Sequence, residues 1–311
     1  MGDGGGDGMF VVYRGGVVSA VAESRHAFLL AAPRGAYTVM RTTQNRQRLL
    51  CFEHHLQRLS TSAMAIGADR TRVEPGRLER DVLHAIRSAM SAGGDGDDEL
   101  NVAVVVDMSG EVAVHLSILK ERETGACVVV EAMRGSRAKY GSTKDSKWVV
   151  ERQGLLDRRT APEADDVVLV NDEGAVLEGL SSNFFVIGAD QVVQTAPVRD
   201  GVLAGSIREI VMHVCRQHDI GIVERSPSWS SRSSWFGAFL TSTSRLVLPI
   251  HQVIDSVSKD SHGLPPLAFP AVHRIIDEIS RLVSDAAHSD EFSRLIFNNG
   301  TCLTQPTKSS S

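Results

Sequence analysis

Apolar residues recur along the chain at two different spacings, and the changes of spacing separate the elements that the sequence predicts. In the first half, short apolar runs bounded by glycine and polar residues predict two strands within 9–22 and further strands at 36–42, 100–107 and 111–119. Between them, apolar residues three or four positions apart predict amphipathic helices at 52–65 and 77–91. The first half is therefore predicted to be strands interrupted by two helices.

The second half mixes strands and helices without a regular alternation. Strands are predicted at 126–133, 167–170, 183–188, 191–195 and 236–240, and helices at 205–217 and 270–284. This order is typical of an α+β fold and not of a doubly wound sheet. A charged stretch that ends in Gly125 marks a boundary, so we expect an N-terminal α+β domain over 1–122 and a second domain over 123–311. Within these, we expect a flexible tail at 1–8 and a polar tail at 303–311.

Composition narrows the classes of partner. The 311 residues carry a formal net charge of −5. No nucleic-acid partner is expected, because binding a phosphate backbone requires a basic face. No run of about 18 uncharged apolar residues occurs, so no membrane span is expected. The N-terminus resembles neither a signal nor a transit peptide, and the four separated cysteines predict reduced thiols and no metal site, which together indicate a cytoplasmic protein.

Two charged side chains, Glu178 and Arg58, each allow two interpretations, one of which is a ligand site. Glu178 and the glycine after it precede the strand predicted at 183–188, and a Glu-Gly pair in such a place is usually a turn. Arg58 lies between apolar positions of the helix predicted at 52–65. Its planar guanidinium suits a phosphate if it points inward, but such a side chain more often extends to solvent.

Two polar segments could hold an anion. Gly205, Ser206 and Ile207 lead into a predicted helix, whose first backbone N–H groups form a ready anion site, although serine is equally favoured as an N-cap. The run 241–244, Thr-Ser-Thr-Ser, ends the strand predicted at 236–240. Hydroxyls and amides at a strand end can bind phosphate oxygens, and a polar loop would have the same composition.

Together the four segments resemble one family. Glu-Gly-x-Ser-Ser-Asn-Phe-Phe, Gly-Val-Leu-x-Gly-x-x-Arg, Thr-Ser-Thr-Ser and His-Leu-Gln-Arg-Leu are similar to motifs of the class IV aminotransferases. This family includes branched-chain aminotransferase, D-amino acid aminotransferase and aminodeoxychorismate lyase. The resemblance extends from about Gly35 to Ile250. It implies a two-domain D-amino acid aminotransferase-like fold, with pyridoxal 5′-phosphate in the cleft between the domains, and a homodimer.

The resemblance also requires a lysine that binds the cofactor, upstream of Glu178. The lysines in that stretch are Lys120, Lys139, Lys144 and Lys147. The family spacing of a little over thirty residues favours Lys144, since 178 − 144 = 34, and leaves Lys147 as the nearest alternative.

Further roles follow from the resemblance. Glu178 would face the pyridine nitrogen of the cofactor. The phosphate would be held by the following groups: Arg58, the backbone amides of Ser206 and Ile207, Ser242 and Thr243. Tyr37 takes the place of an aromatic residue that faces the cofactor. Thr38 stands where the family often has glutamate and where the lyases more readily have threonine, so both are candidates for the substrate side.

The implied activity is a pyridoxal-phosphate-dependent transfer of an amino group between an amino acid and a 2-oxo acid, as in branched-chain or D-amino acid aminotransferases. Lys144 would move the substrate proton as general base and acid, once burial and neighbouring charges have lowered its pKa. Three alternatives remain at this point. They are an aminodeoxychorismate lyase, a catalytically silent protein that keeps the fold, and a binder of sugar or nucleotide phosphates that uses only the phosphate cup.

Overall fold

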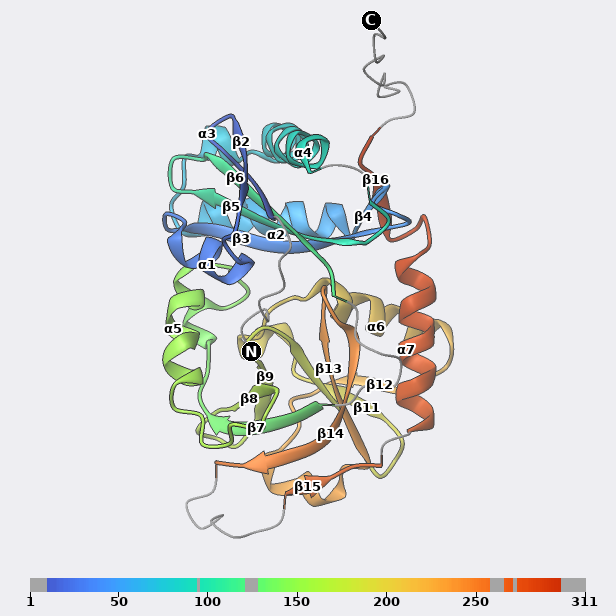
Figure 1. Cartoon of the computed structure of the whole chain (residues 1–311). Helices are drawn as coiled ribbons and strands as arrows, with labels where there is room; N and C mark the ends of the chain where they lie inside the picture. The colour runs from blue at the N-terminus through green and yellow to red at the C-terminus, as the bar shows by residue number, and fades with distance from the viewer. Residues whose placement is uncertain (1–9, 94–95, 121–127, 258–265, 271–272, 298–311) are drawn as a thin grey trace, which may run out of the picture.

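The computed structural model describes residues 10–93, 96–120, 128–257, 266–270 and 273–297. Figure 1 shows two bodies of β-sheet one above the other, with α5 and α7 on opposite sides of the lower body. None of the helices in the described ranges is long and apolar enough to cross a membrane.

The upper body is a seven-stranded sheet with helices on both faces (Figure 1). Its strands, in spatial order, are β16 (Ser293–Leu295), β4 (Arg48–Leu50), β3 (Gly35–Thr43), β5 (Leu100–Asp107), β6 (Val112–Ile118), β1 (Phe10–Arg14) and β2 (Val17–Val21). Its helices are α1 (Arg25–Ala31), α2 (Phe52–Ala65), α3 (Arg70–Val73) and α4 (Pro75–Ala92).

The central strand β3 faces two different environments, because successive side chains of a strand point to opposite faces. Ala36 and Met40 pack in one core with apolar residues of α2 and α4. Tyr37 packs in a separate core with Phe28 of α1 and Val149 of α5, the helix that follows Lys144. The second face of β3 is therefore turned toward the half of the chain that carries the predicted lysine.

The lower body is a nine-stranded sheet that closes on itself. Its strands, in spatial order, are β12 (Ile222–Glu224), β11 (Val193–Thr195), β10 (Asn183–Ile187), β13 (Gly237–Ser242), β14 (Leu246–Asp255), β7 (Val128–Arg134), β8 (Asp166–Val170) and β9 (Val176–Gly179), with β15 (Leu267–Ala268) on β14. Closure occurs where β9 pairs with β10 at Glu178 and Asn183. Three helices accompany this sheet: α5 (Lys147–Leu156), α6 (Ser206–Gln217) and α7 (Arg274–Ala287). Short 3-10 turns lie at Ala138–Tyr140, Val198–Asp200 and Trp229–Ser234.

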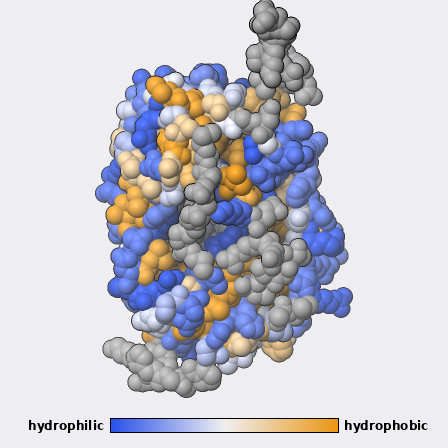
Figure 2. Space-filling model, viewed as in Figure 1, coloured by the Kyte–Doolittle hydropathy of each residue, from blue (hydrophilic) through white to orange (hydrophobic). Residues whose placement is uncertain are grey.

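The outer face of α7 is polar. Asp277, Arg281 and Asp285 are exposed on it, whereas Ile279 and Val283 are buried against α6. The polar band at the right of Figure 2, on the side where α7 lies in Figure 1, contrasts with the apolar residues that gather over the upper sheet.

The predicted strands and helices in the described ranges are confirmed, with ends that shift by a few residues. The pattern does not predict the remaining elements, which are short or lack a clean period: α1, α3, α5, β4, β9, β12, β14, β15 and β16. The helix predicted at 77–91 begins two residues earlier, and its first residue is Pro75, as suits a residue that has no N–H to donate. The boundary near 122 stays a prediction, but β16 pairs with β4, so the last described strand returns to the upper sheet.

The predicted tails at 1–8 and 303–311 lie outside the described residues, as do Cys127 and Cys302. Cys51 and Cys215 are buried free thiols, and burial raises the pKa of each thiol to about 12. This agrees with the prediction of reduced, unreactive cysteines.

Candidate active site

The predicted residues come together where the two bodies meet. The Lys144 ammonium nitrogen lies 4.8 Å from the centre of the Tyr37 ring, which links the second half of the chain to β3. Arg58 of α2 donates to the carbonyl oxygen of Ala204, just before α6, at 2.6 Å. Glu178 accepts from the backbone N–H of Leu203 at 3.0 Å, so the segment 203–206 touches both charged groups.

The loop that carries Lys144 is fixed against β3. The Lys144 N–H donates to the Ser62 hydroxyl at 3.0 Å, and its carbonyl accepts from the Tyr37 N–H at 3.0 Å. The next residue, Asp145, forms an ion pair with Arg34 at 2.9 Å. These contacts place the Lys144 side chain at a defined position beside the sheet.

The surroundings of Lys144 favour its neutral amine. Burial, with the positive charges of Arg58 and Arg137, lowers the pKa of Lys144 well below its usual value, and Glu178 only partly opposes this. The other lysines of this stretch differ. Lys139 is exposed and pairs with Glu151 at 2.5 Å, and the Lys147 side chain is also exposed. Of the four, Lys144 alone combines a buried amine with the predicted neighbours.

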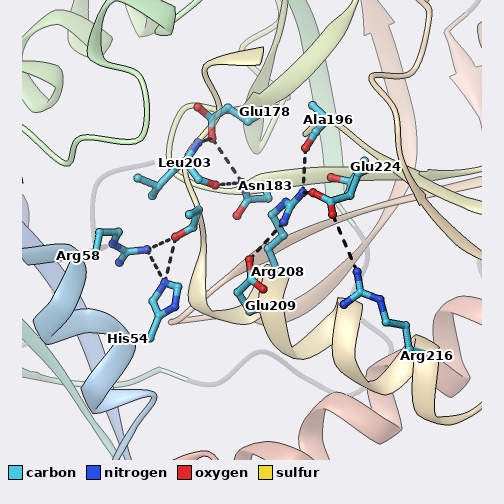
Figure 3. Close-up of polar contacts among 12 residues, drawn as sticks. His54, Arg58, Glu178, Asn183, Ala196, Leu203, Arg208, Glu209, Arg216 and Glu224 are labelled. Atoms are coloured by element: carbon cyan, nitrogen blue, oxygen red, sulfur yellow. Dashed lines mark hydrogen bonds and ion pairs between the residues drawn. The ribbon is translucent and has the colours of Figure 1, made fainter. Parts of the chain in front are cut away.

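Glu178 is a buried carboxylate with one oxygen available. The residue is 3 % exposed, and its Oε2 accepts from the Leu203 N–H and lies 3.5 Å from the Asn183 amide nitrogen (Figure 3). Its Oε1 has no hydrogen-bond partner among the described residues, although Arg137 Nη1 lies 3.5 Å away. Burial raises the pKa of Glu178, and the charge of Arg137 acts against that rise. The turn interpretation does not explain a buried carboxylate of this kind.

Arg58 points inward, as the anion interpretation requires. Its guanidinium donates to the Ala204 carbonyl and, at 3.2 Å, to the Thr38 hydroxyl, while the rings of His54 and His55 lie beside it. Figure 3 shows it reaching from α2 toward the segment before α6. Burial lowers the pKa of Arg58 to about 10.

The start of α6 provides unfilled backbone donors. Gly205 is the N-cap and Ser206 is the first helical residue, so the interpretation of Ser206 as an N-cap is wrong. No side chain caps this helix start, and Ser206 and Ile207 are buried there. A Cβ atom on Gly205 would lie 2.0 Å from Asn183 Oδ1, so only glycine fits. The Ser206 hydroxyl lies 3.3 Å from that of Thr243, which brings the two predicted phosphate segments together.

Ser242 has a different neighbour from Thr243. Its hydroxyl accepts from Arg245 Nε at 3.3 Å, and the same guanidinium forms an ion pair with Asp166 at 2.7 Å. Ser242 therefore shares a turn with Thr243, but its hydroxyl is bonded to Arg245 and not to Ser206.

The model of the family Amino-transferase class IV matches residues 35–253. The chain belongs to the class IV aminotransferases. Over 148 residues, which are 47 % of this chain and 53 % of the relative, it is 30 % identical to the protein of Thermotoga maritima named "Probable branched-chain-amino-acid aminotransferase". It is 27 % identical over 137 residues to the D-alanine aminotransferase of Bacillus licheniformis, which is 43 % of this chain and 46 % of that protein. The chain thus matches about half the length of these curated relatives.

Solved structures support the fold. A branched-chain aminotransferase of Thermoproteus uzoniensis with norvaline superposes with a TM-score of 0.70 at 18 % identity, over 93 % of this chain and 100 % of that one. The PLP-bound form of a hypothetical aminotransferase of Mycobacterium tuberculosis gives a TM-score of 0.70 at 20 % identity, over 91 % and 99 %. The predicted two-domain α+β fold of this family is confirmed.

Pyridoxal 5′-phosphate is the cofactor of class IV aminotransferases, and the residues present fit it. The surroundings of Lys144 lower the pKa of its amine and so favour the form that reacts with an aldehyde, and the available Oε1 of Glu178 suits a pyridine N–H. The uncapped start of α6, with Arg58 and Thr243 close by, suits a phosphate dianion.

Three polar residues near the site were not singled out from the sequence. Asn183 holds the segment before α6 by donating to the Leu203 carbonyl at 2.9 Å, and its place in the Ser-Ser-Asn-Phe motif was the available signal. His55 is fully buried against Thr38. Arg137 lies in an irregular segment before Lys144, where no periodicity marks a buried side chain.

Proposed function

We propose that the chain transfers an amino group between an amino acid and a 2-oxo acid, and that Lys144 is the lysine that binds the cofactor. One observation carries the proposal: a buried lysine with a strongly lowered pKa lies in a single site with a buried carboxylate whose Oε1 is available and with an uncapped helix start. A protein that binds phosphate without catalysis needs neither the lysine nor the carboxylate.

Each predicted residue then has a task. Glu178 would keep the pyridine nitrogen protonated, which makes the ring a better acceptor of electrons. Arg58, the Ser206 and Ile207 amides and Thr243 would neutralise the phosphate and so fix the ring in one orientation. The Tyr37 ring, 4.8 Å from the Lys144 amine, would limit the directions in which that amine can move.

The bound cofactor supplies the electron sink that makes the substrate Cα–H bond acidic. Lys144 Nζ would then take the proton from the substrate Cα and pass it to the C4′ carbon of the cofactor, because the lowered pKa of Lys144 favours the neutral amine that can accept a proton. The positive charges of Arg58 and Arg137 contribute to this lowering of the Lys144 pKa.

For the substrate we propose an aliphatic amino acid of the branched-chain or D-alanine type. The names of the relatives support this choice. So does the apolar character of the β3 face, where Val39 follows Tyr37 in the same core. We also propose the homodimer of the family and a division of the chain near residue 122.

The runner-up is an aminodeoxychorismate lyase, which Thr38 favoured at the level of sequence. In the structure the Thr38 side chain is 1 % exposed and its hydroxyl lies 2.7 Å from His55 Nδ1. It also accepts from Arg58, so its contacts are with the predicted phosphate ligand. This position accounts for Thr38 without a lyase, which leaves transamination as the better-supported activity.

The test is a comparison of Lys144→Ala with Lys147→Ala. We expect the wild type and Lys147→Ala to show the visible absorbance of lysine-bound cofactor and to convert aliphatic amino acids with 2-oxoglutarate, and Lys144→Ala to do neither. If Lys144→Ala kept the band and Lys147→Ala lost it, the lysine assignment would be wrong. Release of pyruvate from aminodeoxychorismate, without transamination, would favour the lyase.

A further inference from the structure

Arg137 is a buried arginine that sits between Glu178 and the loop of Lys144. It is 3 % exposed and lies between β7 and Lys144. One guanidinium nitrogen donates to the Gly141 carbonyl at 3.1 Å and the other to the Thr143 carbonyl at 2.8 Å. Arg137 therefore binds the peptide immediately before Lys144.

The same guanidinium faces the predicted partner of the cofactor ring. Its Nη1 lies 3.5 Å from Oε1 of Glu178, and both side chains are almost fully buried. Carbonyl oxygens satisfy the N–H groups of a guanidinium but do not neutralise its charge, so the carboxylate is the counter-ion that makes burial of this cation tolerable. The contact is electrostatic and leaves Oε1 without a hydrogen bond.

Trp148 lies beside the Arg137 guanidinium. The guanidinium carbon lies 5.6 Å from the centre of the Trp148 ring, within the range of a cation–π contact. The indole N–H donates to the carbonyl of Leu180, two residues beyond Glu178, at 2.9 Å. The segments of Lys144, Trp148 and Glu178 are thus tied to one another through a single arginine.

We propose that Arg137 is a positioning residue of this enzyme, which fixes the Lys144 loop relative to Glu178 and keeps the Glu178 carboxylate ionised and oriented for the pyridine N–H of the cofactor. The proposal rests on the proposed roles of Lys144 and Glu178. The directions of the pKa shifts agree with it, because Arg137 lowers the pKa of both groups.

The first test uses Arg137→Met and Arg137→Lys in the protein loaded with pyridoxal 5′-phosphate. Arg134→Met is the matched control, because Arg134 lies three residues earlier, is exposed and donates only to surface carbonyls. We expect Arg137→Met to weaken cofactor binding by at least tenfold, which is the effect of losing about 1.4 kcal/mol of binding free energy. Arg134→Met should bind like the wild type.

The pH dependence of the visible spectrum separates positioning from mere folding. The charged or titratable groups that act on the Lys144 amine are Tyr37, His55, Arg58, Arg137, Arg152 and Glu178. Loss of one cation should raise the pH midpoint of the spectral change in Arg137→Met by about one unit. Arg137→Lys keeps the charge but not the two-carbonyl fork, so it should restore the midpoint and only part of the affinity. An unchanged midpoint in Arg137→Met would overturn the proposal.

A second measurement needs no cofactor. In the apoprotein, Arg137→Met leaves Glu178 as a buried charge without its counter-ion, so Tm should fall. Adding Glu178→Gln should recover part of that loss of Tm. A double variant whose Tm falls by at least the sum of the falls in the two single variants would overturn the pairing. If Lys144→Ala kept the cofactor band while this recovery was observed, the proposed function would fail and the Arg137–Glu178 pair would stand.

Discussion

Two arginines in neighbouring parts of the molecule, Arg208 and Arg58, differ in how their charges are paired (Figure 3). Arg208 of α6 is 2 % exposed and forms ion pairs with Glu224 at 2.6 Å and with Glu209 at 3.4 Å. Arg58 of α2 contacts a carbonyl, a hydroxyl and two imidazole rings. Among the described residues, no carboxylate lies within ion-pair distance of Arg58.

The contacts of the two arginines distinguish a charge that is paired within the fold from a charge that has no carboxylate partner among the described residues. Arg208 is neutralised within the fold, and it ties α6 to β12 and, through the Ala196 carbonyl at 3.2 Å, to the end of β11. Arg58 is held in place by neutral acceptors and therefore keeps its charge for an anion. A cofactor phosphate would be the missing counter-ion, supplied together with the uncapped start of α6.

The largest expected effects come from replacing each arginine by methionine. Arg208→Met removes the ion pairs to the exposed Glu224 and Glu209 and the bond to the Ala196 carbonyl, and should destabilise the apoprotein by about 1 kcal/mol, read from chemical denaturation. Arg58→Met should leave the stability of the apoprotein unchanged or higher and weaken binding of pyridoxal 5′-phosphate by roughly a hundredfold or about 2.7 kcal/mol, because a charge-assisted phosphate contact is lost. Equal losses of stability in both variants would contradict the distinction.

Inorganic phosphate sharpens the same comparison without the chemistry of the cofactor. It should raise the Tm of the wild-type apoprotein and of Arg134→Met by binding the folded state. It should have little effect on Arg58→Met. Stabilisation of Arg58→Met to the wild-type extent would show that the helix start binds phosphate without Arg58.

Gly205→Ala should give the next largest effect. The new methyl group would lie 2.0 Å from Asn183 Oδ1, so Asn183 or the start of α6 has to move. Overpacking of this kind costs about 1–3 kcal/mol. Cofactor affinity should fall as well, because the Asn183 contact to the Leu203 carbonyl positions the segment before the helix. The check is denaturation together with titration of the cofactor, and Gly76→Ala is the control, since nothing lies within 4 Å of a Cβ atom there.

The sequence predicted the site residues that stand in motifs better than the residues that support them. Glu178, Arg58, Gly205 and Lys144 stand in motifs or at a motif spacing, and the structure brings them together. His55, Ser62 and Arg137 contribute through contacts between segments distant in sequence, which a local pattern does not reveal. The short strands β9, β12 and β16 are not predicted for the same reason. Their pairing with other strands defines them more than their own residues do.

Thr38→Val should have a smaller effect on the same arginine. The substitution keeps the shape of the side chain and removes the hydroxyl that accepts from Arg58 and bonds His55. Loss of one hydrogen bond of about 1 kcal/mol corresponds to roughly a fivefold weaker affinity for pyridoxal 5′-phosphate. The control is Thr71→Val, at an exposed position of α3 where the hydroxyl donates to Asp69. If Thr38→Val instead changed substrate choice and left cofactor affinity intact, the hydroxyl would belong to the substrate side.

The last effect concerns the acid sensitivity that His55 confers. Burial and the charge of Arg58 lower the pKa of His55 well below its usual value of 6.5, so the folded protein holds this ring neutral. The unfolded chain protonates it below about pH 6.5, and the stability due to the neutral ring is therefore present above that pH and lost as the pH falls. His55→Asn should reduce the slope of stability against pH between 6.5 and 5 by up to about 1.4 kcal/mol per pH unit. His218→Asn, an exposed histidine at the end of α6, should keep the wild-type slope. An unchanged slope in His55→Asn would mean that the ring is protonated in the folded protein, and Arg58 would then lie beside a second cation.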